Sequence, residues 1–123
     1  MIYYTTIEQA EHLVELGLDP KTADMFYFLD PTPAGNIYHL AMQGIDIRVR
    51  NLPEYNNGDL PCWSIGALLE LMPESYQLTR GKDNKCQFML FHILIHDWFN
   101  TPLEAVYNMV CYLLENGYIK KGT

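Results

Sequence analysis

The stretch TPLEAVYNMVCYLLENGY, residues 101–118, decides the fold because it carries a complete set of signals for an amphipathic helix. Thr101 is the expected N-cap, a proline occupies the first helical position, and Glu104 completes a capping box. Gly117 is predicted to end the helix in a Schellman motif, with Tyr118 packing on Leu113. The apolar residues between these ends recur at helical spacing, which predicts one buried stripe along the helix.

The segment before this helix has the pattern of an antiparallel hairpin. Tyr76–Thr79 and the stretch from Cys86 to about Ile95 flank a polar, turn-rich run at residues 80–85. The second arm is apolar at almost every residue. We therefore expect it to be covered on both faces, either in the middle of a sheet or at a dimer seam.

The N-terminal half begins with a predicted helix and continues into strands. Thr5 or Thr6 is the expected cap of the first helix, and Gly17 is expected to end it. Asp19 followed by a proline predicts a short second helix that ends near Met25. After it we expect strands at Met25–Leu29, Ile37–Met42 and Ile45–Arg50, with loops at Asp30–Asn36 and Asn56–Asp59.

A further helix is predicted between Pro61 and Pro73, where apolar residues fall at helical spacing. Two starting points remain open, a cap at Ser64 or a start nearer Pro61. Together these elements predict an α+β protein with three to four helices packed on one antiparallel sheet. Residues 1–123 are expected to form a single domain.

Composition excludes several classes of protein. A chain of 123 residues that is 49% hydrophobic is too apolar to be disordered. We find no leader that combines basic residues with an apolar run, so secretion is not expected. The longest apolar stretch, Phe88–Phe99, is too short to span a bilayer. We expect a cytoplasmic protein that does not bind a membrane.

The net charge of −7 is distributed unevenly along the chain. Residues 1–61 hold nine acidic and three basic side chains, whereas residues 62–123 hold six and five. Nucleic-acid binding requires cations that neutralise phosphates, so no DNA or RNA partner is expected. Two interpretations of the acidity remain open: it keeps a small domain soluble, or it meets a basic patch on another protein.

Three segments carry a resemblance that covers nearly the whole chain. They are Ala23–Met25 after a capped helix, Leu60–Pro73 (LPCWSIGALLELMP), and Asn100–Val106 leading to Leu114–Ile119. In this order they resemble a group of small prophage and mobile-element proteins of gut bacteria, which share a P-x-W-S-x-x-x-L-L-x-x-x-P helix and a final helix beginning N-P-x-(D/E)-A. Thr101 departs from the second motif, since it stands between the Asn and the Pro. The resemblance implies a mobile-element context in a bacterial cytoplasm, and it implies no chemistry.

His92, His96 and Asp97 form the most suggestive cluster for a metal. On a helix, residues four apart lie about 6 Å apart and could share an ion. On a strand they lie about 13 Å apart, which is too far. Because we predict a strand here, we expect no metal and no cofactor.

Two residues near the middle helix suggest nucleophiles without supporting motifs. Ser64 lacks the first glycine of a nucleophile elbow, because Cys62 occupies that position. Cys62 also lacks the sequence context of a cysteine protease. The three cysteines Cys62, Cys86 and Cys111 are widely separated and have apolar neighbours, so we expect reduced, buried thiols.

By elimination, the sequence predicts a non-enzymatic protein that acts through protein–protein interaction. The alternative is a small metal- or thiol-dependent enzyme that uses His92, His96 and Asp97, or Cys62. The partner is expected to be another protein or a second copy of this chain. Aromatic residues in or near loops are the expected interaction surface, because aromatics are enriched in binding surfaces; they are Tyr38, Tyr55, Trp98 and Phe99.

Overall fold

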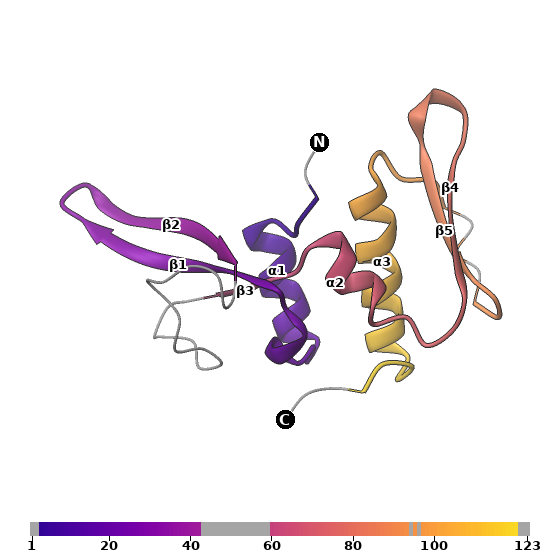
Figure 1. Cartoon of the computed structure of the whole chain (residues 1–123), viewed down its shortest axis with the longest axis horizontal. Helices are drawn as coiled ribbons and strands as arrows, with labels where there is room; N and C mark the ends of the chain where they lie inside the picture. Colours follow the sequence, from indigo (N-terminus) through magenta and orange to yellow (C-terminus); the bar gives the residue numbers. More distant parts are fainter. Residues whose placement is uncertain (1–2, 43–59, 94, 96, 121–123) are drawn as a thin grey trace.

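The helix expected at residues 101–118 is present as α3, Pro102–Glu115, and it lies at the centre of the molecule (Figure 1). A computed structural model of the chain describes residues 3–42, 60–93, 95 and 97–120. Within them, α3 is accompanied by α1, Ile7–Glu15, and by α2, Ile65–Leu69. The strands are antiparallel, so the α+β class is confirmed. None of the described helices is long and apolar enough to cross a membrane.

The ends of α1 follow the predicted capping signals. Thr6 is the N-cap, and its side chain and that of Gln9 form the reciprocal bonds of a capping box. Gly17 has φ of 93°, the left-handed conformation that glycine adopts without strain. The second helix is only a 3₁₀ turn, Pro20–Thr22, with Asp19 as its cap. It ends before Met25 because that residue already pairs in a strand.

A three-stranded sheet projects from the helices with strand order β2-β1-β3 (Figure 1). Its strands are β1, Met25–Thr32, β2, Gly35–Met42, and β3, Leu60–Cys62. The turn or loop predicted at residues 30–36 is reduced to the turn between Thr32 and Gly35, since β1 and β2 pair up to these two residues. The strand predicted at 45–50 and the loop predicted at 56–59 lie outside the described residues.

The prolines that suggested a loop fit this hairpin. Pro33 lies in the tight connection between Thr32 and Gly35, a turn position for which proline is pre-shaped. Pro31 pairs with Asn36, next to the closing pair of the hairpin. Because hydrogen-bonded and non-hydrogen-bonded pairs alternate, the missing N–H of Pro31 faces away from β2. β3 pairs only with residues 25–27 of β1, so no ladder bond is lost there.

The middle helix α2 is shorter than predicted, since β3 occupies Leu60–Cys62 before it and the helix already ends at Leu69, before Pro73. Ser64 is the N-cap, which decides between the two starting points. Its Oγ accepts a hydrogen bond from the backbone N–H of Ala67 at 3.1 Å. Its backbone N–H donates to Oδ1 of Asp24 at 2.9 Å, which joins the start of α2 to the start of β1.

The predicted hairpin before α3 is confirmed, and it forms a second sheet of two strands. β4, Tyr76–Arg80, pairs with β5, Cys86–Leu90, across a turn that includes the 3₁₀ segment η3, Lys82–Asn84. The prediction of a single sheet is thus wrong, and so is the prediction that the second arm runs to about residue 95 in the middle of a sheet. β5 ends at Leu90, and the described residues of 91–98 form neither strand nor helix.

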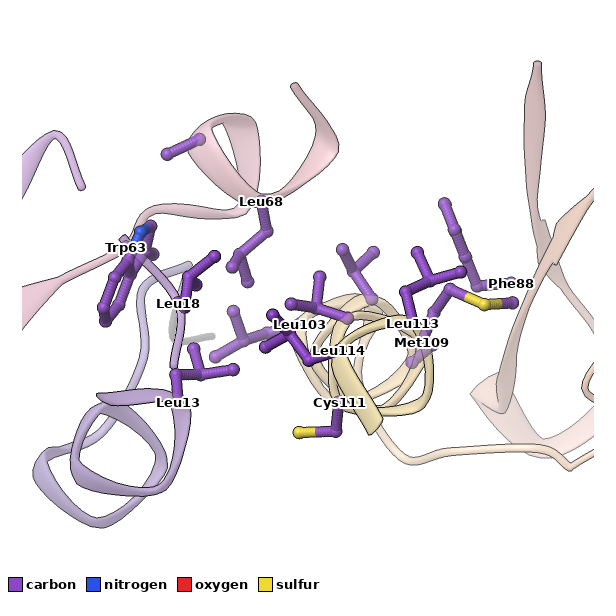
Figure 2. Packing of buried hydrophobic residues seen from close by; sticks show 14 of the residues in the cluster. Leu13, Leu18, Trp63, Leu68, Phe88, Leu103, Met109, Cys111, Leu113 and Leu114 are labelled. Atoms are coloured by element: carbon purple, nitrogen blue, oxygen red, sulfur yellow. The ribbon is translucent and has the colours of Figure 1, made fainter. Parts of the chain in front are cut away.

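The buried stripe of α3 packs against two parts of the molecule. Figure 2 shows Trp63 and Leu68 on one side of α3 and Phe88 on the other. The side chain of Cys111 points away from both of these sides. The indole N–H of Trp63 donates to Oγ1 of Thr22 at 2.9 Å, so this fully buried ring keeps a polar partner. The fully buried α3 residues are Val106, Met109, Val110, Leu113 and Leu114.

Both ends of α3 are tied by short-range bonds. Oγ1 of Thr101 accepts from the N–H of Glu104 at 3.1 Å, as predicted. The Glu104 carboxylate instead accepts from the N–H of Asn100 at 3.3 Å, so the reciprocal half of the capping box is shifted by one residue. The N–H of Tyr118 donates to the carbonyl of Leu113 at 2.8 Å, which is the bond of a Schellman motif. The Tyr118 ring is exposed and stacks on Tyr112.

Candidate functional site

The aromatic residues expected to form one surface are separated in space. Trp98 and Phe99 lie beside the β4–β5 hairpin. The backbone N–H and carbonyl of Phe99 bond to those of Cys86 at 2.7 Å each. Tyr38 is a β2 position paired with Leu29, and β2 lies on the opposite side of the helices from β4 and β5 (Figure 1). Tyr55 lies outside the described residues.

Trp98 has a structural contact although its side chain is 46% exposed. Its ring lies directly over Gly81 at the end of β4. A Cβ at position 81 would stand only 2.6 Å from Cζ3 of the indole. Trp98 therefore covers the backbone of the hairpin turn, and only its outer surface is available to a partner.

The residues proposed for a metal are not gathered in the described part of the chain. Nδ1 of His92 lies 2.9 Å from Oε2 of Glu74, and the His92 backbone N–H donates to Oε1 at 2.5 Å. These two bonds hold the pKa of the Glu74 carboxyl below its usual range. The described residues contain no group of three or more His, Cys, Asp or Glu side chains able to hold an ion. His96 lies outside them, so its predicted divergence from His92 stays a prediction.

Cys62 has the surroundings of a structural thiol. Its side chain is fully buried, and its Sγ lies 3.6 Å from Oγ1 of Thr5 and 3.5 Å from the Thr5 carbonyl. Burial is the main cause that raises the pKa of this thiol, which disfavours the reactive thiolate. The hydroxyl of Tyr27 donates to the same carbonyl at 2.7 Å. This network joins the N-terminal segment to β1 and β3.

Ser64 also has a structural explanation. Its Oγ donates to Oδ2 of Asp24 at 2.5 Å while it accepts the capping bond from Ala67. A nucleophilic serine needs a base that withdraws its proton and an open approach for a substrate. Here the hydroxyl is used at both ends to fix the start of α2.

The most promising feature for binding is a groove of about 440 Å³ between α3 and the segment before it. Its apolar part comes from half-buried side chains and from Tyr112, which is 39% exposed. Two exposed carboxylates, Asp97 and Glu115, also line it. The full set of lining residues is Ile95, Asp97, Phe99, Asn108, Cys111, Tyr112 and Glu115. The groove thus combines an apolar surface with negative charge, and we call it the α3 groove.

Cys111 contributes a protonated thiol to the α3 groove. It is 8% exposed, and burial raises its pKa to about 11 although a hydrogen bond with Tyr107 opposes the shift. At neutral pH this side chain is a small neutral hydrophobe and a poor nucleophile. The groove is accordingly suited to contact and not to thiol chemistry.

The α3 groove was not predicted from the sequence, although the spacing of the residues on its helical side could have indicated that side. Four of its residues are spaced by three and four along α3, on a face away from the fully buried stripe. The other half comes from the irregular segment at 95–99, whose position depends on contacts distant in sequence. The four helical residues are Asn108, Cys111, Tyr112 and Glu115.

A second, smaller groove of about 310 Å³ lies on the β4–β5 hairpin. Phe91 borders it, is 74% exposed and makes an edge contact with the ring of His92. Tyr76 also lines it and is 48% exposed. Large exposed apolar side chains on one hairpin are a feature of interaction surfaces.

No family model, curated protein or solved structure is significantly similar to this chain.

Proposed function

We propose that this protein is a non-enzymatic accessory protein that acts through protein–protein interaction. Its partner in this proposal is a basic protein segment that inserts an apolar side chain into the α3 groove. In keeping with the resemblance drawn from the sequence, we place it in the cytoplasm of a bacterium that carries a prophage or another mobile element. The single observation that carries the proposal is the combination of apolar lining and paired carboxylates in this groove.

The lining supports a mixed mode of binding. The rings of Phe99 and Tyr112 offer apolar area to a buried anchor, the type of contact that dominates the energy of interfaces. Asp97 and Glu115 are exposed, so a lysine or arginine beside the anchor would meet a negative charge without desolvating it fully. An acidic partner would be repelled at the same place.

The charge of the whole chain supports the same choice of partner. A net charge of −7 favours encounter with basic surfaces and raises the association rate at low salt. Six of these seven charges arise from residues 1–61, whereas the groove belongs to the other half. The N-terminal half would therefore steer a basic partner toward the molecule, and the groove would select it.

Charge reversal tests the proposal with a matched control. The test variant carries Asp97→Lys and Glu115→Lys, and the control carries Glu8→Lys and Glu11→Lys on the exposed face of α1. Both variants change the net charge by the same amount and alter only exposed side chains. Each protein and the unaltered chain is used to capture partners from a bacterial lysate, with quantification by mass spectrometry.

We expect a basic protein that is retained by the unaltered chain and by the α1 control and lost by the groove variant. The loss should be at least about tenfold, since two charge pairs become two repulsions. Equal loss of the captured protein in both variants would show that retention depends only on the total negative charge. It would overturn the proposal that the α3 groove selects the partner. Retention of the same proteins by all three chains would overturn the proposal as well.

A further inference from the structure

The outer edge of β4 is open in the described part of the chain, whereas the outer edge of β5 is bonded at both of its ends. Two ladder bonds, from the Gly81 N–H to the Lys85 carbonyl at 2.8 Å and from the Phe91 N–H to the Ser75 carbonyl at 3.1 Å, identify hydrogen-bonded pairs of the hairpin. Pairs alternate along an antiparallel ladder, so the even-numbered residues of both strands direct their N–H and carbonyl groups outward. On β5, Phe99 bonds to the N–H and the carbonyl of Cys86 at one end, and the Ile93 carbonyl accepts from the N–H of Leu90 at the other.

On β4 the outward groups belong to Tyr76, Leu78 and Arg80. Within the described part of the chain, no hydrogen bond to the backbone of these three residues is found on that side. The strand is straight and has no bulge, because its register runs without a break from Tyr76 to Arg80. Its only charged residue is Arg80, at one end. Natural edge strands are usually protected by charges, prolines or bulges, whereas β4 has a single charge at one end, no proline and no bulge.

The side chains on this edge are apolar on the face that meets α3. Tyr76 stacks on the buried ring of Phe88 with centroids 5.4 Å apart, so both lie on that face. α3 contacts β5, and it leaves Tyr76 48% and Leu78 40% exposed. This face of the hairpin therefore extends beyond the part that α3 covers.

We propose that a second copy of this chain pairs with the outer edge of β4, so that two hairpins form one continuous four-stranded antiparallel sheet. An axis through Leu78, perpendicular to the sheet, gives the register with the largest overlap. Leu78 then lies opposite its own copy, and Tyr76 lies opposite Arg80 of the second copy. All outward backbone groups of the strand are satisfied in this register.

The side chains are self-complementary in the same register. Arg80 can lie over the face of Tyr76 of the second copy, a favourable contact for a guanidinium. Gln77 lies opposite Thr79, at a pair where side chains approach closely.

Charge favours the antiparallel arrangement over a parallel one. Glu74 precedes β4, while Arg80 and Lys82 lie at its other end. Antiparallel pairing places the acidic end of one strand beside the basic end of the other, whereas parallel pairing would join like charges. The surplus of acidic residues lies mainly in residues 1–61, outside this hairpin.

Leu78→Pro is the sharpest test, because the N–H that proline removes is not used within the hairpin. The substitution should leave the fold intact, as proline is tolerated at outward positions of edge strands. It should weaken the dimer at least about tenfold, measured by sedimentation of the full chain over a concentration series. Leu78→Lys is the second variant, to be used if the proline variant does not fold by circular dichroism.

Cysteine cross-linking tests the register. In the proposed dimer the two Cα atoms at position 78 lie about 5.5 Å apart, within reach of a disulfide. Leu78→Cys should therefore form a covalent dimer on mild oxidation, and Arg80→Cys should not, because its two copies lie about 13 Å apart. The three natural cysteines are buried and serve as the same background in both variants.

Each possible result decides the inference. A chain that stays monomeric at high concentration overturns it, as does a dimer that survives both Leu78→Pro and Leu78→Lys. Cross-linking through Arg80→Cys in place of Leu78→Cys overturns the register. A monomer that still captures a basic protein through the α3 groove would leave the proposed function standing, so the two proposals can fail separately.

Discussion

The two hairpins of this protein are built alike in topology and differ in how they are held. The β4–β5 hairpin lies against α3, with Phe88 and Leu90 in the central cluster and Trp98 over its turn. The β1–β2 hairpin is longer and projects from the helices, and β3 pairs only with residues 25–27 at its base (Figure 1). None of the β1 and β2 side chains that the structure describes belongs to the central cluster of buried side chains.

The comparison shows that the arrangement of a hairpin can be fixed either by the burial of one of its faces or by the geometry of its turn. In β5 the alternation of buried and half-buried residues fixes which side meets α3. In β1–β2 the turn at Pro33 and Gly35 and the paired backbone determine the register. We therefore expect substitutions to act through packing in the first hairpin and through local backbone geometry in the second.

The largest difference in the free energy of unfolding is expected between two variants that each remove an aromatic ring, one from each hairpin. Phe88→Ala should lower the free energy of unfolding by about 3–5 kcal/mol, because the side chain is 2% exposed and leaves a cavity. Phe28→Ala should cost less, about 1 kcal/mol, because Phe28 is only half-buried; its ring stacks on that of His39 and is tilted against that of Phe26. Urea unfolding of both variants measures the difference. Equal losses would show that the β1–β2 hairpin is as firmly packed as β4–β5.

An intermediate effect is expected from the two turn glycines. Gly81→Ala should cost about 1–3 kcal/mol, because the new methyl group displaces the ring of Trp98. Gly35→Ala should cost about 1 kcal/mol for a different reason, the φ of 127°, since no atom lies within 4 Å of the added Cβ.

A Trp98→Ala background separates these two causes. There the cost of Gly81→Ala should fall to a few tenths of a kcal/mol, since the clashing ring is gone, while the cost of Gly35→Ala should not change. Thermal or urea unfolding of the single and double variants provides both cycles. An unchanged cost of Gly81→Ala in this background would contradict the contact between position 81 and the indole.

The smallest effect is expected from the exposed pair of Glu74 and His92. Because the folded-state pKa of Glu74 is lowered, its stabilising effect is present above the ordinary carboxyl range and is lost as the pH falls through the lowered value. Glu74→Gln should remove this dependence. We expect the unaltered chain to lose slightly more stability than the variant between about pH 6 and about pH 3, measured by unfolding at each pH. Parallel pH profiles would contradict the assignment.

Much of the fold was predictable because its signals are local. The caps of α1, α2 and α3 depend on bonds between residues at most five positions apart, so Thr101 and Gly117 could be assigned from the sequence. The starts of α1 and α2 could each be narrowed to two alternatives, which the structure decides in favour of Thr6 and Ser64. The β4–β5 hairpin was predictable for the same reason, since its arms are close in sequence. The candidate site was not predictable as a whole, because Asp97 reaches the groove lined by Glu115 only through the path of an irregular segment.

The sequence by itself determined the helices, the acidic charge and the class of the fold, because capping bonds, helical spacing and composition require no distant partner. Tertiary structure decided that Pro31 lies in a strand, since its missing N–H is harmless only where no third strand pairs. It also decided that the strands form two sheets, that β4 keeps an open edge, and that carboxylates surround the groove beside α3. The open edge of β4 and the groove depend on which surfaces α3 packs against, and no local sequence pattern identifies these surfaces.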